Sequence, residues 1–366
     1  MIKGKLNISL DFLYAKTPPL IGVDICSSSI KMVELSESAN KNGYVVENYV
    51  IEELPQNAVS DGNVNDLEAV SECLRRAWKK MGTRIKNISL ALPAATVISK
   101  KIFLPAGLNE EDMEYHVTTE ANQYIPFAID EVSLDFQIIG PAPGNAAEVE
   151  VLLAASRNAN VEDRVAVAQV AGLKVVVMDV EHYAAEMAFD QVRMQLLGGA
   201  ADQCVALVDI GANVMNVNIL RNGQSVYMRD QQMGGNQLTQ HIQNAFGLSV
   251  EEAEAGKLHG GLPENYENDV LAPFRENVAG EVFRAIQLFF TSTQFNEVSY
   301  IVLAGGCAAL FNLDDAVATR TQVKTLVANP FAQMAMSARV NQRQLQIDAP
   351  ALMIAGGLAM RRFDPS

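Results

Sequence analysis

Short apolar runs rich in β-branched residues alternate along the chain with longer segments whose apolar residues recur every three to four positions. This alternation is typical of α/β or α+β folds with mixed sheets. The helical spacing is clearest at residues 65–82 and predicts a helix that ends at Gly82 as its C-terminal cap. Residues 86–93 predict a strand that Pro93 closes. The apolar positions of the predicted helix are Leu67, Val70, Leu74, Ala77 and Trp78.

One strand–turn–strand pattern occurs twice. The segment GVDICSSSIKMVEL begins at Gly22 and LVDIGANVMNVNIL begins at Leu207, and the two align when Asp24 is matched to Asp209. In each segment the aspartate near the end of an apolar strand precedes a run of small or polar residues. Internal repeats indicate related structural units, so we predict two related lobes.

A second pair of similar segments contains double glycines. IVLAGGCAAL at 301–310 aligns with LMIAGGLAMR at 352–361, and each is predicted as an apolar strand that runs into Gly-Gly and then into a helical segment. The order of the four segments places one cleft between the lobes, with the last segment returning to the first lobe. The aligned glycines are Gly305 and Gly306 in the first segment and Gly356 and Gly357 in the second.

The composition describes a globular chain without a nucleic-acid-binding surface. Its 366 residues are 49% hydrophobic and 19% charged, enough for two lobes with their own cores, and a net charge of -15 argues against contact with nucleic acid. Residues 1–16 lack the apolar region of a secretory signal, and the apolar runs are shorter than the ~20 residues of a spanning helix. We therefore expect a cytoplasmic protein. The cysteines Cys26, Cys73, Cys204 and Cys307 are too scattered to predict a disulfide framework or a metal site.

The two turns have the chemistry of a phosphate site. Small residues let backbone N–H groups approach an anion closely, and Asp24 and Asp209 would supply oxygen ligands for Mg²⁺. The hydroxyls of residues 27–29 and the ammonium of Lys31 add donors to the first turn. One such turn alone is more often an ordinary polar hairpin, but two aligned copies favour a nucleotide.

Glu254 and Lys257 lie three residues apart in residues 248–260, which predict a helix. Without further context the pair is interpreted as a solvated intrahelical ion pair, worth a few tenths of a kcal/mol.

The order of these segments resembles the actin-like ATPase superfamily, whose members carry the motifs phosphate 1, connect 1, phosphate 2, adenosine and connect 2. In this sequence the motifs would lie at 22–31, 175–188, 207–217, 301–310 and 352–360. Within that superfamily the chain resembles the PilM family of type IV pilus assembly proteins over nearly its whole length. The stretches that carry this resemblance are 100–140, 155–181, 233–257 and 327–334.

The resemblance implies an actin-like, RNase H-like fold of two lobes with a nucleotide cleft, in which an FtsA-type subdomain replaces the usual actin subdomain. The expected units are the first lobe (1A) at 1–87, 171–200 and 346–366, the FtsA-type subdomain (1C) at 88–170, the second lobe (2A) at 201–246 and 300–345, and a helical or mixed subdomain (2B) at 247–299.

The resemblance also implies ATP and Mg²⁺ as cofactors, with the metal at Asp24 and Asp209. Cys26 stands where family loops usually carry Gly, and Met215 stands where relatives often carry Thr. The loops are therefore predicted to hold ATP rather than to split it, with at most weak ATPase activity. Glu181 is the candidate for orienting a catalytic water, and is equally well a surface or capping carboxylate. The residues expected at the nucleotide are Asp24, Ser27, Ser28, Ser29, Lys31, Asp209, Gly211, Asn213, Glu254, Lys257, Gly305 and Gly306.

The resemblance finally implies a partner at the inner membrane. PilM-like proteins bind the cytoplasmic N-terminal tail of PilN in a groove between the first lobe and the FtsA-type subdomain. This predicts a cytoplasmic scaffold, peripheral to the inner membrane, that reaches the membrane only through partners and couples to pilus motor ATPases and other platform proteins in pilus biogenesis and twitching motility. Assembly into a homo-oligomer or ring stays open.

Two segments are candidates for such contacts. The segment 10–20 predicts an amphipathic helix that ends before Pro18 and Pro19 and packs on the body, a partner or the membrane. The apolar run Tyr124, Ile125, Pro126 and Phe127 is a candidate edge of the peptide groove, although such a run is more often core.

Two other functions of the same superfold are alternatives. A kinase needs a base beside its acceptor hydroxyl and a pocket for a polar substrate, whereas the extra segment here is rich in aliphatic residues. A polymerising cell-division protein like FtsA ends in a membrane-binding helix, whereas this sequence reaches MRRFDPS directly after the last motif.

Overall fold

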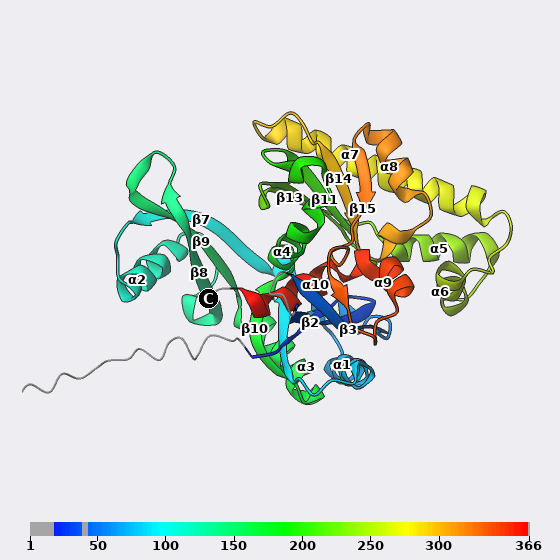
Figure 1. Cartoon of the computed structure of the whole chain (residues 1–366), viewed down its shortest axis with the longest axis horizontal. Helices are drawn as coiled ribbons and strands as arrows, with labels where there is room; N and C mark the ends of the chain where they lie inside the picture. Colours follow the sequence, from blue (N-terminus) through cyan, green and yellow to red (C-terminus); the bar gives the residue numbers. More distant parts are fainter. Residues whose placement is uncertain (1–17, 39–42, 365–366) are drawn as a thin grey trace, which may run out of the picture.

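The computed structural model describes residues 18–38 and 43–364, and its first lobe is built on a six-stranded sheet (Figure 1). Strand β1 lies inside this sheet, antiparallel to β2 and parallel to β6. All five residues of β1 are buried, because helices cover the sheet there. The strand order is β10 (Lys174–Val180), β6 (Asn87–Leu92), β1 (Ile21–Ile25), β2 (Ser29–Glu37), β3 (Tyr44–Glu53) and β16 (Ala335–Met336).

The second lobe repeats the centre of the first. Its five-stranded sheet places β11 antiparallel to β12 and parallel to β14, as β1 lies between β2 and β6. This confirms the two predicted strand–turn–strand units. The strand order is β13 (Gln224–Gln231), β12 (Met215–Arg221), β11 (Cys204–Ile210), β14 (Tyr300–Ala304) and β15 (Lys324–Val327).

Helices cover both sheets. The predicted helix at 65–82 is confirmed as α1 (Leu67–Met81), capped by Asp66 and by Gly82 at φ 62°. Pairs of helices pack closely, α1 on α3 and α4 on α10. The remaining helices are α3 (Asn158–Ala171), α4 (Glu181–Arg193), α5 (Gly235–Phe246), α6 (Val250–His259), α7 (Ala272–Ser292), α8 (Leu313–Thr321), α9 (Gln342–Asp348) and α10 (Met353–Met360). Shorter helical turns lie at Ala94–Thr96, Ile129–Glu131, Leu197–Ala200, Glu267–Leu271, Gly306–Ala309, Ala349–Leu352 and Arg361–Phe363.

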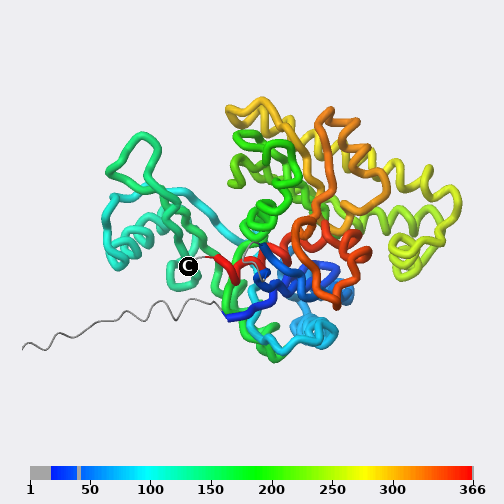
Figure 2. Tube along the Cα trace, in the orientation of Figure 1, coloured from blue at the N-terminus to red at the C-terminus, as the bar shows by residue number. Residues whose placement is uncertain are grey.

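A small unit projects from the first lobe (Figures 1 and 2). Its sheet has the order β7 (Val97–Pro105), β9 (Asn145–Arg157), β8 (Val132–Ala142), and α2 (Glu110–Ala121) packs on it around a separate apolar core. We call residues 97–157 the three-stranded unit. A two-residue hairpin, β4 (Val59–Ser60) with β5 (Asn63–Val64), lies on the first lobe.

Strand pairing departs from the expected boundaries at three points. Strand β6 and helix α3 fall inside the predicted segment 88–170, yet β6 pairs in the six-stranded sheet and α3 packs on α1. Strand β16 falls in the predicted second-lobe segment 300–345, yet it pairs with β3. The division into four subdomains stays a prediction.

The predicted strand at the last double glycine is wrong, because residues 353–360 form helix α10. The run is apolar on every side and buried, and such a run cannot be distinguished from a short strand by periodicity. Gly357 lies against the Ala184 carbonyl of α4, and Gly22 of β1 lies against the Ala355 carbonyl, so that a side chain at either glycine would collide with backbone. The glycines therefore serve helix and sheet packing.

The predicted helix that ends before Pro18 lies wholly outside the described residues. Within residues 18–38 and 43–364, no helix is both long and apolar enough to cross a lipid bilayer.

Candidate functional site

The first turn follows Asp24, a 2% exposed residue of β1. The N–H of Cys26 closes the turn on the carbonyl of Ser29 at 3.1 Å. Asp24 accepts from the Lys31 ammonium at 3.2 Å and from the Cys26 thiol at 3.2 Å, and Lys31 Nζ is 2.9 Å from Cys26 Sγ. Burial and the Asp24 charge raise the pKa of Cys26 to about 12, so the thiol stays protonated. Burial opposes the charge of Lys31, but the neighbouring Asp24 carboxylate favours it, and the pKa of Lys31 is raised.

The predicted serines of this turn have different environments. Ser29 is buried at the start of β2, where it pairs with Glu53, while Ser28 is exposed and accepts the N–H of Leu54 on its carbonyl. Ser27 is half-buried. The amides of Ser27 and Ser28 therefore form the open part of the turn, where an anion can approach.

The second turn repeats this geometry after Asp209. The N–H of Gly211 closes it on the carbonyl of Val214 at 3.0 Å, the equivalent of the bond in the first turn. Burial raises the pKa of Asp209 to about 6, with Lys31 opposing and Asp24 adding to the shift. Because these charges act on each other, the structure brings both turns to one site between the lobes.

The two aspartates differ as metal ligands. Within the described part of the chain, no group donates a hydrogen bond to the Asp209 carboxylate, whereas Asp24 is neutralised by Lys31. The Asp209 side chain is half-buried, and a half-buried carboxylate that receives no hydrogen bond from the protein fits a cation. The described residues contain no cluster of three or more His, Cys, Asp and Glu. Magnesium prefers carboxylate oxygens together with phosphate oxygens and water, so Asp209 would hold Mg²⁺ only together with a bound phosphate.

The first double glycine supports the second turn. Gly305 follows β14 at φ +86°, and a Cβ there would lie 2.6 Å from Asp209 Oδ1 and collide with the Ile210 carbonyl. Its N–H donates to the Pro350 carbonyl at 2.8 Å. Nothing lies within 4 Å of a Cβ added at Gly306. The predicted strand is confirmed, and the helical segment after it is the short turn Gly306–Ala309.

The predicted helix with Glu254 and Lys257 is confirmed as α6, and their pair is part of a larger network. Lys257 Nζ lies 2.7 Å from Glu254 and 2.8 Å from Thr239 Oγ1, and 3.4 Å from the Gly235 carbonyl. The hydroxyl of Thr239 also donates to Glu254. Since only 13% of the Lys257 side chain is exposed, the pair is more than a solvated surface contact.

This network reaches the second turn through the start of α5. The N–H of Gly235 donates to the Gly211 carbonyl at 3.0 Å, and Asn236 Nδ2 donates to Asn213 Oδ1 at 2.7 Å. We assigned no role to Gly235 or Thr239 from the sequence, although Gly-Gly before a helical pattern was a usable signal.

Glu181 also faces this site, from the first position of α4. Burial raises its pKa to about 8, with Asp24 and Asp209 adding to the shift and Arg164 opposing it. Without a bound cation the carboxyl is therefore mostly protonated at pH 7 and a poor general base.

Arg164 is a second residue that sequence reasoning missed. It lies on α3 with 2% of its surface exposed, and its guanidinium donates to the Ile25 carbonyl at 3.0 Å. It shares a helix face with the buried Val167, Ala168 and Ala171. A charged residue at an apolar-face position was the available signal.

The candidate peptide-binding run lies apart from the two turns, in the three-stranded unit (Figure 1). Ile125 belongs to the core of that unit, whereas Pro126 is exposed and Tyr124 is 42% exposed. Lys100 lies over the Tyr124 ring at 5.2 Å and Arg157 over the Phe127 ring at 4.3 Å. The run therefore presents only part of its apolar surface.

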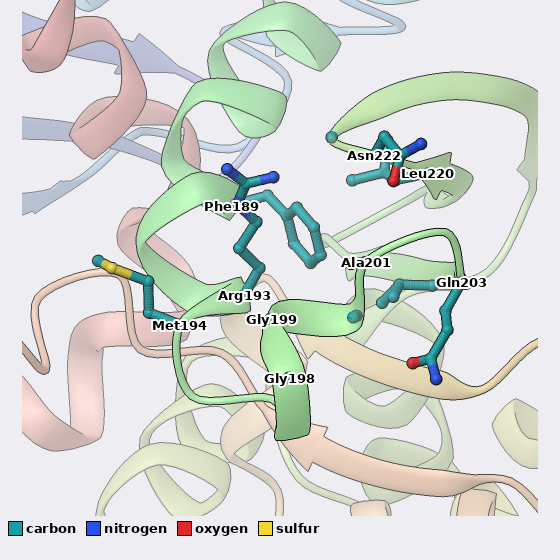
Figure 3. Close-up of a pocket in the computed structure, with 12 residues that line it drawn as sticks. Phe189, Arg193, Met194, Gly198, Gly199, Ala201, Gln203, Leu220 and Asn222 are labelled. Carbon is teal, nitrogen blue, oxygen red and sulfur yellow. The ribbon is translucent and has the colours of Figure 1, made fainter.

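A cavity of about 340 Å³ lies at the other end of α4 from Glu181 (Figure 3). It contains none of the predicted site residues. Its lining comes from α4, the loop after it, β11 and the β12–β13 hairpin: Phe189, Arg193, Met194, Gly198, Gly199, Ala200, Ala201, Gln203, Val205, Leu220, Asn222 and Gly223.

Comparison with known proteins decides the family. The family model described as type IV pilus assembly protein PilM matches residues 22–363. The chain belongs to the PilM family. Its role is accordingly in type IV pilus assembly.

Solved structures agree with this assignment. The chain is 27% identical to a chain of the PilM-PilN type IV pilus biogenesis complex, with a TM-score of 0.79 over 95% of this chain and 100% of that one. The ethanolamine utilization protein EutJ from Carboxydothermus hydrogenoformans is 18% identical, with a TM-score of 0.58 over 94% and 89%. A diol dehydratase-reactivating factor is 10% identical, with a TM-score of 0.52 over 94% and 100%. The last two likenesses concern the fold alone, which is the actin-like fold.

Proposed function

We propose that this PilM-family chain is an ATP-binding scaffold of the type IV pilus assembly platform. The observation that carries the proposal is the pair of equivalent turns after Asp24 and Asp209, whose charges act on each other across the lobes. Two sets of turn amides and two carboxylates suit a nucleotide with its metal better than any other small anion, because a polyphosphate reaches both turns at once.

Different residues of the site would bind the phosphates, the metal ion and the nucleoside. The amides after Asp24 and those after Asp209 would cradle the phosphates from opposite lobes, and Lys31 adds a positive charge beside the first turn. Bound Mg²⁺ would neutralise phosphate charge and bridge to the Asp209 carboxylate. The network of Lys257, Glu254 and Thr239 holds α6 against α5, which is consistent with the proposed place of these residues beside the ribose and base.

Hydrolysis is proposed to be weak at most. Glu181, the candidate for orienting the attacking water, is mostly protonated at neutral pH in the protein alone. An efficient phosphoryl transfer needs a correctly ionised group that orients the water.

We further propose that the partner is the cytoplasmic tail of a PilN-like inner-membrane protein, since the similar structure is a PilM-PilN complex. The exposed Tyr124 and Pro126 give the three-stranded unit an apolar edge for an extended peptide. The protein would thus lie in the cytoplasm at the inner membrane, held there by partners that include pilus motor components, and support pilus biogenesis and twitching motility.

Calorimetry with Mg-ATP tests nucleotide binding. Wild type is expected to bind, and the double variant Asp24→Ala with Asp209→Ala is expected to lose at least 100-fold in affinity. Equal binding by both folded proteins would overturn the proposed site.

Titration with a synthetic peptide of the PilN-like tail tests the partner. We expect binding by wild type, weaker binding by Tyr124→Ser and no change in Tyr115→Ser, whose side chain is 71% exposed on α2. No binding to folded wild type would favour the kinase or FtsA-like alternative, and an equal effect of both variants would remove Tyr124 from the groove.

A further inference from the structure

Arg164 is a buried cation that joins two backbone segments of the first lobe. Its Nη1 donates to the Ile25 carbonyl at 3.0 Å, and its Nη2 donates to the Gly62 carbonyl at 2.9 Å. Ile25 is the last residue of β1 and directly precedes the open part of the first turn. Gly62 lies between β4 and β5 at φ +79°, where a Cβ would come within 2.5 Å of Pro93. Both acceptors therefore sit on constrained backbone.

The charge of Arg164 is balanced by the nucleotide site and not by its hydrogen-bond partners. Carbonyl oxygens carry no net charge, and burial alone lowers the pKa of the guanidinium. Glu181 in its ionised form and Asp24 are the foremost groups that oppose this shift, with Asp163 on α3 contributing less. In return Arg164 lowers the pKa of Glu181. The guanidinium charge thus interacts with the carboxyl groups of the candidate site, while its N–H groups donate to the backbone carbonyls of Ile25 and Gly62.

The support for Arg164 comes from the three-stranded unit. Helix α3 begins directly after β9, the central strand of that unit. Asn160 Nδ2 donates to Ser156 Oγ at 3.0 Å, and Ser156 Oγ donates to the Thr96 carbonyl at 2.8 Å. These bonds fix the first turn of α3 to the base of the unit. Arg164 stands one further turn along the same helix.

We propose that Arg164 is the positioning residue of the first phosphate turn. By holding the Ile25 carbonyl it fixes the backbone that leads into the amides of Ser27 and Ser28, and its positive charge acts on the Asp24 carboxylate. It acts through the turn and does not itself contact the nucleotide. This inference rests on the proposed function, which names ATP as the ligand. The effect of Arg164 on the backbone of the first turn does not depend on any ligand.

The test compares three variants with wild type. Arg164→Met keeps the length of the side chain but removes its charge and donors, and Arg164→Lys keeps the charge with a single donor group. Arg75→Met is the matched control, because Arg75 Nη2 also donates to a backbone carbonyl, that of Val170 at 2.7 Å, on the exposed side of α1 and α3. Affinity for Mg-ATP is measured by calorimetry, and amide hydrogen exchange of residues 25–30 is measured without nucleotide.

We expect Arg164→Met to weaken Mg-ATP binding at least tenfold and to speed exchange at 25–30 while the centre of the six-stranded sheet stays protected. Arg164→Lys should recover part of the Mg-ATP affinity and part of the protection at 25–30. Arg75→Met should match wild type in affinity and in exchange. Wild-type affinity and exchange in folded Arg164→Met would overturn the proposal, as would a loss that Arg164→Lys does not reduce and that spreads over the whole sheet. If Arg164→Met does not fold, Arg164→Lys carries the same comparison with a smaller expected effect.

The two measurements, calorimetry with Mg-ATP and amide hydrogen exchange, separate the role of Arg164 from the proposed function. Failure of wild type to bind Mg-ATP would count against the nucleotide site, while faster exchange at 25–30 in the Arg164 variants would still support the positioning role. Binding by wild type with unchanged exchange and affinity in the variants would leave the nucleotide site in place and remove Arg164 from it.

Discussion

In both strand–turn–strand units a backbone N–H closes the turn on the carbonyl three residues further on, from Cys26 to Ser29 and from Gly211 to Val214. The residue that faces the aspartate across the strands differs. Asp24 pairs with Lys31 in register, whereas Asp209 pairs with Asn216. The first carboxylate therefore has a salt-bridge partner on the neighbouring strand, whereas an uncharged asparagine lies opposite the second.

The supports behind the turns differ as well. Side chains hold the first turn, from Arg164 at the Ile25 carbonyl to Lys31 beside Cys26. Glycine backbone holds the second, because Gly235 donates to the Gly211 carbonyl and Gly305 lies against Ile210. The first turn is thus supported by charged side chains and the second by closely packed glycine backbone.

The largest effect is expected from Gly305→Ala, which breaks the backbone support of the second turn. The new Cβ would collide with the Ile210 carbonyl at a φ of +86°, so we expect a loss of about 2–4 kcal/mol in the free energy of unfolding. Urea unfolding measures it. Gly306→Ala is the control, since nothing lies within 4 Å of its added Cβ, and an equal loss in both variants would contradict the packing argument.

The charge difference is tested next by Asp24→Asn and Asp209→Asn. Asp24→Asn leaves the Lys31 ammonium, 13% exposed, without its counter-ion, and should cost about 1–3 kcal/mol. Asp209→Asn removes a half-buried carboxylate that receives no hydrogen bond from the described residues, and it should be neutral or stabilising at pH 8. Equal destabilisation by the two substitutions in urea unfolding would remove the distinction between the turns.

The pH dependence of stability tests the raised pKa values of Asp209 and Glu181. Asp209 has a pKa raised from 3.8 to about 6 and Glu181 from 4.5 to about 8, so the folded state holds their protons more tightly than the unfolded state. Their contribution is fully present below about pH 4 and is lost as pH rises to 8. We therefore expect Glu181→Gln to be the more stable protein at pH 8 by about 1–2 kcal/mol and to show a flatter profile between pH 4.5 and 8.

Glu276→Gln, at an exposed position of α7, is the control for this profile. Thermal unfolding at several pH values measures the three proteins. A Glu181→Gln profile that follows wild type would show that Glu181 does not titrate in the folded protein as described.

The smallest effect is expected from Cys26→Gly, which gives the first turn the residue of the second. The thiol donates to an aspartate that Lys31 already pairs, so we expect a change within about 1 kcal/mol. Affinity for Mg-ATP should stay within threefold of wild type. A large gain in ATP hydrolysis by this variant would instead show that the thiol suppresses catalysis, and steady-state phosphate release measures it.

The sequence was sufficient for the features that repeat or have a regular period. The alignment of Asp24 with Asp209 predicted both turns, and the spacing of Leu74 and Ala77 with Gly82 after them predicted α1. Residues 353–360 show the limit, because a short run that is apolar on every side has no period to separate strand from helix.

Long-range contacts could not be predicted in the same way. Arg164 meets Ile25 across 139 positions, and a single sequence does not state which backbone carbonyl a buried guanidinium will reach. The contact of Gly235 with Gly211 likewise depends on how α5 docks on the second turn. The local sequence pattern is enough to identify the two turns. The residues that support each turn are determined by tertiary packing.

The central claim is that both turns hold one nucleotide. Amide hydrogen exchange of wild type with and without saturating Mg-ATP tests it most directly, read at residues 26–29 and 211–214 in the same sample. The account predicts that both segments gain protection together and that both lose it in the double variant Asp24→Ala with Asp209→Ala. Protection of one segment alone, or of neither while calorimetry shows binding, would contradict it.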